Sequence, residues 1–564
     1  MAQERYDMIV MGAGWFGLAA AKTHLELHPS EDLLVLEAES SCGGTWSENR
    51  LYADLKSNNL HGSYEYPDFP MDPAAYGITH DDHIPGKVVH KYLTDFAKKF
   101  GVYARTRFNT KVESLGPASD GGWIIRTASE GDEKEKTLHC KKVIVATGLT
   151  SQPNFPQYAG AETFHAPYFH AKDFCRQGDT IKTSERAVIV GGGKSAMDVA
   201  FAYANKGVQV DMVIRPGGNG PIWISHPYVM GGKRLESLMH VRWMSWFSPC
   251  PWGGLDSWLG NKMRSFLHGT AVGRFIVDKF WAGLGGEVLT ANAYDTHPEV
   301  QKLKPWNSAF WIGSGFSIHN YDRNLFDMVK RGEIKVHIAD IDRLTKHTVH
   351  LTNGTDLPAD VLICSTGWRK EPSIRFLNFG TAGIGLPQNP SEQAALITAY
   401  DSKLLKMYPR LTNQPTLNFQ PKANPFRLYR FMIPPARIQD RNIAFAGMVS
   451  SVSSSICASV QALWISAFLD GRLPHLASLT TEEVTDEVML HTQWGKWRYP
   501  NGYGAHLPDL VFEAVPYFDL MLRDLGLEVN RKGSGWREVT EPYGPGDYRG
   551  LTEEWVERAS GLEA

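Results

Sequence analysis

The sequence is poor in cysteine, in net charge and in long hydrophobic runs. Only 6 cysteines occur in 564 residues, and they stand far apart with no CxxC pair. This spacing argues against a zinc site, a disulfide framework and the paired redox cysteines of a disulfide reductase. We therefore expect six reduced thiols in a cytoplasmic protein.

The charge pattern offers little to nucleic acid or to a metal ion. The formal net charge is −3, and no run of five or more like charges occurs. Binding through phosphates needs a basic patch, so no nucleic-acid partner is expected. The 20 histidines are scattered, and the pair His24 and His28 lacks the glutamate of an HExxH motif. No metal site is predicted.

No segment has the pattern of a signal peptide or a membrane anchor. The first strand is expected by about Tyr6, which leaves no room for a signal-peptide core. One uncharged stretch of bilayer length, 445–469, contains seven serines and Gln461, which favour a buried helix. Residues 536–564 alternate charged and apolar positions. We expect a cytoplasmic protein without a transmembrane anchor.

What the sequence does contain, close to its start, is a strand, a glycine turn and a helix in direct succession. The apolar run 6–11 leads into Gly12-Ala-Gly14-Trp-Phe-Gly17 and then into an alanine-rich helix. Gly12 permits the turn, Gly14 lets the backbone approach a pyrophosphate, and Gly17 lets helix and strand pack closely. The helix N-terminus adds partial positive charge. The motif predicts a dinucleotide site.

An acidic residue restricts which dinucleotide this first unit binds. The second strand, 33–36, ends in Glu37, twenty residues beyond Gly17. A carboxylate at that place accepts hydrogen bonds from the ribose hydroxyls and repels a 2′-phosphate. The first unit is therefore predicted to bind FAD or NAD and not NADP.

The same order of elements returns at 187–204. A strand is followed by Gly191-Gly-Gly193-Lys194-Ser195-Ala196 and a helix, which predicts a second nucleotide. The next strand, 210–214, ends in Arg215, whose guanidinium suits a 2′-phosphate, and Lys194 adds positive charge in the turn. NADPH is therefore favoured over NADH. The alternative is that Arg215 is a solvated residue at a strand end.

These motifs together resemble those of one family. The two glycine turns, Glu37, the run Gly43-Gly44-Thr45-Trp46 and two strands that end in Thr-Gly occur in its order. The chain resembles the flavin-containing monooxygenases, including their fungal biosynthetic relatives, except between about 216 and 311 and in the last hundred residues. The resemblance implies a flavin reduced by NADPH, oxygen adding to flavin C4a, and a hydroperoxide that transfers one oxygen atom to a substrate.

The resemblance also points to Asn58 as the catalytic residue. It falls where these monooxygenases place an asparagine beside the flavin, whereas the related Baeyer-Villiger enzymes usually have an aspartate there. An amide can hydrogen-bond the flavin edge or a hydroperoxide without adding charge. The alternative is that Asn58, between Ser57 and Asn59, is a turn residue whose side chain satisfies the local backbone.

Two segments leave alternatives open. The family's marker histidine is either His170 or His165, and the residues around His170 fit the family better. Residues 216–311 hold eight of the 17 tryptophans and are interpreted as an inserted, mainly helical segment. Its aromatic side chains form an ordinary core, cover an apolar substrate, or touch a membrane surface through Trp243 and Trp246.

The predicted fold is α/β, with two Rossmann-like dinucleotide-binding domains. The FAD-binding domain consists of 1–164 and 346–564, which ends in C-terminal helices, and the NADPH-binding domain is 165–345, with the insert at about 216–311. The residues predicted to bind the cofactors are Gly12, Gly14, Phe16, Gly17, Glu37, Gly44, Thr45, Trp46, Asn58, Tyr64, Ala146, Gly447, Gly191, Gly193, Lys194, Ser195, Ala196, Arg215, Thr366 and Gly367.

The predicted function is FAD- and NADPH-dependent transfer of one oxygen atom from O2 to a small apolar organic substrate, in secondary metabolism. Baeyer-Villiger insertion into a ketone is the nearest alternative, and an NADPH-dependent flavoprotein reductase or oxidase is an alternative of another class. A peripheral membrane contact and a homodimer both remain open as partners.

Overall fold

A sheet of eight strands forms one side of the molecule. The computed structural model describes residues 4–129, 136–254, 257–419, 424–533 and 535–563. The order across the sheet is β23-β6-β7-β8-β1-β2-β5, and β24 pairs with β8 off this path. The strands are β1 (Glu4–Met11), β2 (Leu33–Leu36), β5 (Thr106–Arg107), β6 (Thr110–Pro117), β7 (Trp123–Ser129), β8 (Lys136–Val145), β23 (Arg375–Phe376) and β24 (Ile443–Phe445).

The parallel part of this sheet positions the first glycine turn. β1 pairs in parallel with β2 on one side and β8 on the other, so Met11, Leu36 and Val145 lie in register. The last four residues of β1 are buried, as is usual for a parallel strand covered on both faces. Helix α1 (Trp15–Leu27) begins just beyond this edge. Its N-terminus therefore faces the space outside the carboxyl ends of the strands.

The uncharged stretch forms the buried helix α14 (Ser454–Leu469), which packs along α1. Gln461 is satisfied inside this core, because its Oε1 accepts the Gly447 N–H at 2.9 Å and its Nε2 donates to Tyr517 Oη at 2.9 Å. The prediction of a buried helix is confirmed. Across the described part of the chain, no helix combines the length and apolarity needed to cross a membrane.

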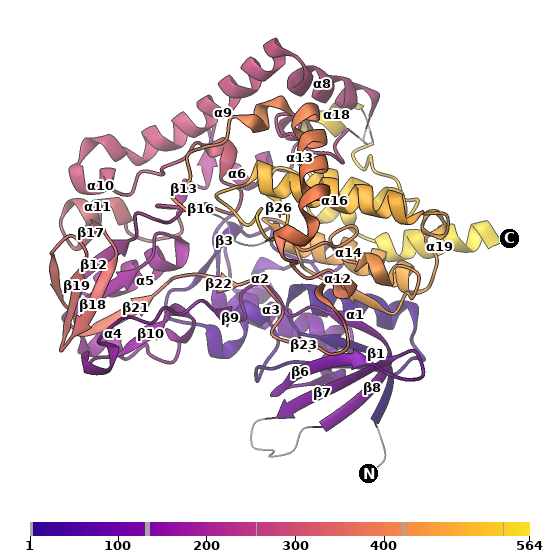
Figure 1. Ribbon diagram of the computed structural model, residues 1–564, viewed down its shortest axis with the longest axis horizontal. Coiled ribbons are helices and arrows are strands. Elements are labelled where there is room, and N and C mark those ends of the chain that lie inside the picture. The colour runs from indigo at the N-terminus through magenta and orange to yellow at the C-terminus, as the bar shows by residue number, and fades with distance from the viewer. Residues whose placement is uncertain (1–3, 130–135, 255–256, 420–423, 534, 564) are drawn as a thin grey trace.

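A second sheet of five strands lies beside the first, at the left of Figure 1. Its order is β10-β21-β11-β12-β17, and every pair is parallel. Its strands are β10 (Tyr168–His170), β11 (Arg186–Val190), β12 (Gln209–Ile214), β17 (Ile334–Ile338) and β21 (Val361–Cys364). Helix α5 (Lys194–Ala204) connects β11 to β12. The α/β architecture with two Rossmann-like units is confirmed, and the domain boundaries stay predictions.

The chain between β12 and β17 is mainly helical. Two short strands there, β13 (Trp223–Ser225) and β16 (Phe316–Ile318), pair in parallel. The helices are α6 (Leu235–Leu238), α7 (Arg242–Ser245), α8 (Trp258–Gly269), α9 (Ala271–Asn292), α10 (Pro298–Gln301) and α11 (Leu325–Lys330). With 22 residues, α9 is about 33 Å long, and it runs with α8 along the top of Figure 1.

Most tryptophans of this segment belong to its core. The buried ones are Trp223, Trp246, Trp252, Trp281 and Trp311. The interpretation as an ordinary core is therefore confirmed for most of the set. Trp246 cannot make the membrane contact considered above, because its ring lies inside the protein. Trp243 and Trp306 are half-buried, and Trp258 is 75% exposed.

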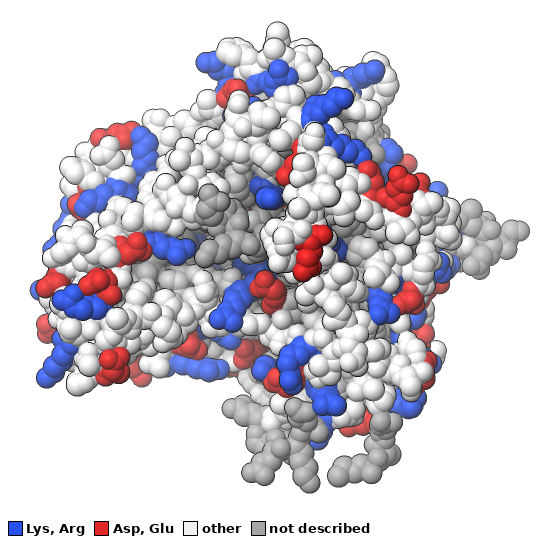
Figure 2. Space-filling model, viewed as in Figure 1, with Lys and Arg blue, Asp and Glu red and all other residues white. Residues whose placement is uncertain are grey.

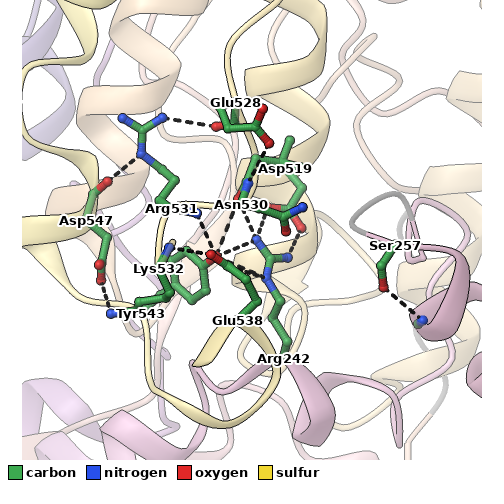
Figure 3. A network of polar contacts seen from close by, with 12 residues as sticks. Arg242, Ser257, Asp519, Glu528, Asn530, Arg531, Lys532, Glu538, Tyr543 and Asp547 are labelled. Carbon is green, nitrogen blue, oxygen red and sulfur yellow. Dashed lines mark hydrogen bonds and ion pairs between the residues drawn. The ribbon is translucent and has the colours of Figure 1, made fainter. Parts of the chain in front are cut away.

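A buried ionic network joins this segment to the C-terminal helices (Figure 3). Arg242 of α7 pairs with Asp519 of α17 (Ala514–Asp524), and its Nη2 also donates to Tyr543 Oη at 2.9 Å. Both charged side chains are almost completely buried. Removing one partner from such a pair typically costs about 3–5 kcal/mol, because the other charge is left buried. The network therefore fixes the segment against the C-terminal part.

Candidate active site

The first of two large cavities lies outside the carboxyl ends of β1, β2, β8 and β24. Its volume is about 730 Å³. Nine of the predicted FAD residues line it, together with Gly148, Arg50, Lys172 and Tyr503. The nine are Gly12, Gly14, Phe16, Glu37, Gly44, Thr45, Tyr64, Ala146 and, from the second part of the chain, Gly447.

The first glycine turn has no room for side chains. Gly12 has φ of +110°, and a Cβ there would lie 2.4 Å from the carbonyl oxygen of Ala146. A Cβ on Gly17 would lie 1.9 Å from the carbonyl oxygen of Gly12. Both contacts are with backbone, which cannot move aside easily. The bare turn at the start of α1 is the cradle that a pyrophosphate needs.

Glu37 lies at the end of β2 with its carboxylate held in place. Its Oε2 accepts the Ala13 N–H at 2.7 Å, and its Oε1 accepts the Glu39 N–H at 2.9 Å. Burial raises the pKa of this carboxyl, while the two backbone N–H groups act in the opposite direction. A carboxylate fixed beside the glycine turn fits an adenosine ribose. The residues of this cavity therefore fit FAD.

Two predicted FAD residues lie behind the cavity wall. Gly17 packs under the turn, as described above. Trp46 does not line the cavity, and its Nε1 donates to Tyr64 Oη at 3.0 Å, so it supports the tyrosine that does. Arg50 and Lys172 were not predicted. Arg50 lies four residues beyond the run Gly43–Trp46 and Lys172 two residues beyond His170, but no spacing rule assigns either position to a cofactor.

The second cavity lies outside the carboxyl ends of β11, β12 and β21. Its volume is about 640 Å³. All the residues predicted for NADPH line it, and Asn58 lines it too. These residues are Gly191, Gly193, Lys194, Ser195, Ala196, Arg215, Thr366 and Gly367.

The second glycine turn is tight at one position and open at another. Gly191 has φ of +136°, and a Cβ there would lie 2.5 Å from the carbonyl oxygen of Ser365. A Cβ on Gly193 would meet no atom within 4 Å, so the space above it is free for a ligand. Arg215 is exposed at the end of β12. An open turn with a cation at the next strand end fits a dinucleotide with a 2′-phosphate.

Lys194 faces inward in this arrangement. Its ammonium pairs with Asp198 and donates to Asn320 Oδ1 at 2.8 Å. It also lies 4.6 Å from the centre of the Tyr321 ring. The geometry leaves Arg215 as the more accessible cation, and a phosphate role for Lys194 stays a prediction.

Asn58 lies on a strand, β3 (Lys56–Leu60), and not in a turn. Its Oδ1 accepts a hydrogen bond from Ser317 Oγ at 3.2 Å, across 259 positions of sequence. The side chain is therefore not satisfied by the local backbone, and it is exposed toward the second cavity. The alternative interpretation of Asn58 as a turn residue is wrong, because β3 pairs with β4 (His83–Pro85).

Of the two candidate marker histidines, His170 lines the second cavity and His165 does not. His170 Nδ1 accepts the Lys172 N–H at 3.1 Å, so its Nε2 carries the proton and donates to the Gly367 carbonyl at 3.1 Å. Burial lowers the pKa of His170, which keeps the ring neutral. His165 is exposed, with φ of +57°.

Tyr503 lines both cavities. Lys370 lies beneath it, with Nζ 3.8 Å from the ring centre, and Asp509 accepts the Tyr503 N–H at 3.2 Å. Tyr503 is therefore part of the wall of both cavities, and Asn501 and Gly502 next to it line the second. Sequence motifs gave no indication of this segment, which lies more than 300 positions beyond the second glycine turn.

Comparisons with known proteins agree with this geometry. The family described as "Pyridine nucleotide-disulphide oxidoreductase" matches residues 9–225. An FAD-dependent monooxygenase of Pyrenophora dematioidea is 35% identical, over 93% of this chain and 99% of the relative. FAD-dependent monooxygenase DEP4 of Alternaria brassicicola is 32% identical, over 98% of this chain and 95% of the relative.

Solved structures share the fold. Cyclohexanone-bound cyclohexanone monooxygenase superposes with a TM-score of 0.60 at 16% identity, over 93% of this chain and 98% of that chain. The polycyclic ketone monooxygenase of Thermothelomyces thermophila gives 0.62 at 16% identity, over 93% and 88%. At these identities the likeness concerns the fold alone.

The six cysteines are all free, and burial raises the pKa of Cys42 to about 12, so dithiol chemistry at the flavin has no support.

Proposed function

The chain belongs to the FAD-dependent monooxygenases, and from this premise we propose that it uses NADPH to place one oxygen atom of O2 into a small apolar organic substrate. The observation that carries the proposal is the shared wall at Tyr503, which joins the FAD cavity to the second cavity. Hydride transfer requires a nicotinamide and a flavin in contact. Tyr503 borders both cavities, so the two nucleotides would approach each other beside this residue.

NADPH as the reductant is supported by the second cavity. Its open turn at Gly193 leaves space for a pyrophosphate, and the exposed guanidinium of Arg215 suits a 2′-phosphate. Glu37 excludes that phosphate from the first cavity. The charges at the two strand ends thus support FAD in one cavity and NADPH in the other.

Asn58 is the residue that we propose for the oxygen-transfer step. FAD, when bound, supplies the two-electron chemistry by which O2 is activated. Asn58 adds a neutral amide at the second cavity, oriented by Ser317 and able to donate a hydrogen bond to an oxygen atom. A neutral donor can hydrogen-bond an oxygen atom that keeps its proton, and it does not favour the deprotonated, negatively charged form of that oxygen as a cation would. This favours transfer to an electron-rich carbon, nitrogen or sulfur over insertion into a ketone.

The substrate is proposed to be apolar because aromatic side chains line the second cavity. Such a substrate fits the proposed role in secondary metabolism. Trp223, Trp306, Phe316 and Trp368 are among the residues that line the cavity. Such rings bind flat apolar molecules by area and by stacking. The same wall also accepts a ketone, so Baeyer-Villiger insertion remains the competing proposal.

Labelled dioxygen tests the proposal. The purified yellow protein is supplied with NADPH, isotopically labelled O2 and panels of amines, sulfides, polyketide-like aromatics and ketones. We expect one labelled atom in an organic product for each NADPH oxidised. Stoichiometric peroxide with every panel would identify an oxidase and overturn the proposal. A lactone or ester carrying the label would establish the Baeyer-Villiger alternative.

A further inference from the structure

Exposed apolar side chains are concentrated in one part of the chain, the helix pair α8 and α9. Among the described residues, 14 large hydrophobic side chains are exposed, and six of them lie between 258 and 276. This cluster, called here the α8–α9 tip, consists of Trp258, Leu259, Phe266, Val272, Phe275 and Ile276. Trp258, Val272 and Phe275 are 75%, 64% and 60% exposed. Surface apolar residues normally occur singly, so a cluster of this size indicates a contact.

The core of the protein does not account for these side chains. On α9 a buried stripe runs through Gly273, Val277, Trp281 and Val288, at intervals of one and two helical turns. Val272, Phe275 and Ile276 lie outside this stripe. An ordinary surface helix is polar opposite its buried face. The first part of α9 carries apolar side chains on its buried face and also on its exposed face, where Val272, Phe275 and Ile276 lie.

The charges around the tip are positive. Lys262 lies 5.9 Å from the Trp258 ring centre, and Lys279 lies 5.3 Å from that of Phe275. Arg274 contacts the Gly269 carbonyl at 3.2 Å, at the turn between the helices. The acidic residue beside them, Asp278, pairs with Arg410 from the following part of the chain.

The tip also lies at an edge of the molecule. α8 and α9 form the crest at the top of Figure 1, opposite the first sheet. Figure 2 shows uncharged surface over much of this crest, with Lys and Arg side chains spread along it and a smaller acidic patch at its lower left. A flat surface can therefore approach the tip without first meeting another part of the protein in this view.

We propose that the α8–α9 tip docks the protein on the surface of an anionic lipid bilayer. Aromatic and aliphatic side chains enter the boundary between headgroups and acyl chains, while Lys262, Arg274 and Lys279 pair with anionic headgroups. The basic margin selects a bilayer over a second copy of this chain, because two such tips would repel each other.

The helix α9, which carries part of the tip, also packs against the wall of the second cavity. A Cβ on Gly285 of α9 would lie 3.2 Å from Trp223, so this helix packs directly on a residue of the cavity wall. The helix that carries part of the tip thus also supports the site. An apolar substrate dissolved in a bilayer would be close to its enzyme. The docking itself does not depend on the proposed function.

Vesicle co-sedimentation with the full-length, flavin-loaded protein tests the proposal. Vesicles of phosphatidylcholine mixed with phosphatidylserine are compared with vesicles of phosphatidylcholine alone. We expect the protein to sediment with the mixed vesicles, less with the neutral ones, and less again as salt is raised. Protein that stays in the supernatant with mixed vesicles at low salt would overturn the proposal.

Two variants separate the apolar and the charged parts. Trp258→Ser with Val272→Ser and Phe275→Ser should weaken binding to mixed vesicles by about tenfold or more. Lys262→Glu with Lys279→Glu should weaken binding to mixed vesicles and leave binding to neutral ones unchanged. Trp536→Ser is the matched control, because Trp536 is 76% exposed on α18 (Gly535–Thr540), outside the tip.

Flavin content and circular dichroism establish that each variant is folded. Activity on a dissolved substrate without vesicles should be unchanged in all of them, so failure of docking and failure of the oxygenation proposal are distinguishable. Equal binding by wild type and the triple variant would contradict the assignment. So would a homodimer that dissociates in the triple variant while no vesicle binding is seen.

Discussion

The two nucleotide units of this chain share one order of elements and differ in how they hold their turns. In the first, the third glycine, Gly17, lies against the backbone of Gly12. In the second, the matching position is Ala196, whose methyl group is accommodated in the core. The strand that follows ends in a buried acid in the first unit and in an exposed cation, Arg215, in the second.

This difference separates the features that hold a nucleotide in place from those that select one nucleotide over another. The first unit is closed by backbone contacts and by a carboxylate fixed on two N–H groups, as suits a cofactor that stays bound. The second unit is open above Gly193 and has an exposed cation, Arg215, at the next strand end, as suits a reductant that exchanges. Four predictions test this contrast.

The largest effect is expected from Gly17→Ala. The new methyl group would collide with the Gly12 carbonyl oxygen, which belongs to the backbone and cannot move aside easily. We expect a loss of about 3 kcal/mol or more in the free energy of unfolding. The purified protein should also lose its yellow colour. Flavin absorbance per polypeptide and chemical denaturation measure the two effects.

The reverse change in the second unit, Ala196→Gly, is the matched control. It should cost about 2 kcal/mol, from helix propensity and a lost methyl contact. Flavin content should stay at the wild-type level. Equal losses of flavin in the two variants would show that the units are not held in different ways.

A second effect is expected at the cation that selects NADPH. In Arg215→Ser the charge-assisted hydrogen bond to the 2′-phosphate is lost, and such bonds contribute about 1.5–3 kcal/mol. The KM for NADPH should therefore rise roughly 10–100-fold, while that for NADH stays the same. Steady-state oxidation of each nucleotide provides the measurement.

Arg186→Ser provides the comparison for this change, because Arg186 is exposed at the opposite end of β11. It should leave both KM values at the wild-type level. A parallel rise for NADPH and NADH in Arg215→Ser would mean that the residue contacts some part common to both nucleotides.

Acid should destabilise the first unit through His24, a buried residue of α1. Burial lowers the pKa of His24 from 6.5 to about 4. Below about pH 6.5 the unfolded chain therefore binds a proton at His24 that the folded protein does not bind. The free energy of unfolding is unaffected by this group above about pH 6.5 and decreases as the pH falls toward 4. At pH 5 the loss from this group is about 2 kcal/mol.

His24→Gln should remove that part of the acid sensitivity. The difference in unfolding free energy between pH 8 and pH 5 should shrink in the variant, as measured by denaturation at the two values. An unchanged difference would show that His24 is not protonated on unfolding in this range.

The smallest of the four effects is expected at Asn58. In Asn58→Leu the amide that we propose for oxygen transfer is lost, which corresponds to about one hydrogen bond. The ratio of organic product to NADPH consumed should fall about tenfold, and hydrogen peroxide should rise in its place. NADPH binding and flavin content should not change.

Ser317→Ala provides a graded comparison, because it removes the hydroxyl that donates to Asn58 Oδ1 and keeps the amide. A smaller fall in the product ratio is expected. If the ratio in Asn58→Leu equals that of wild type, Asn58 belongs to the cavity wall and has no part in oxygen transfer.

Much of the fold could be predicted because its signals are local. The glycine turns, Glu37 and Arg215 each come directly after a strand, within a unit of about thirty residues. In such a unit the order of strand, turn and helix determines where each residue lies. The buried helix at 454–469 was also predictable, since its serines and Gln461 are incompatible with lipid and satisfiable in a core.

The remaining features depend on contacts between distant parts of the chain. Tyr503 reaches both cavities only because Asp509 and the neighbouring loop hold it there. Trp46 was expected at the flavin and lies behind Tyr64, since the motif fixes its position in the turn and not its direction. The exposure of Trp258 could not be inferred, because residue spacing does not tell which face of a helix finds a partner.

The central claim is that NADPH and FAD meet at the wall formed by Tyr503. Anaerobic rapid mixing tests it most directly, by following the visible absorbance of the bound flavin. We predict that NADPH bleaches the flavin at least about tenfold faster than NADH at equal, subsaturating concentration, a difference that Arg215→Ser should remove. A flavin that NADPH leaves oxidised, or that both nucleotides reduce at the same rate, would contradict the claim.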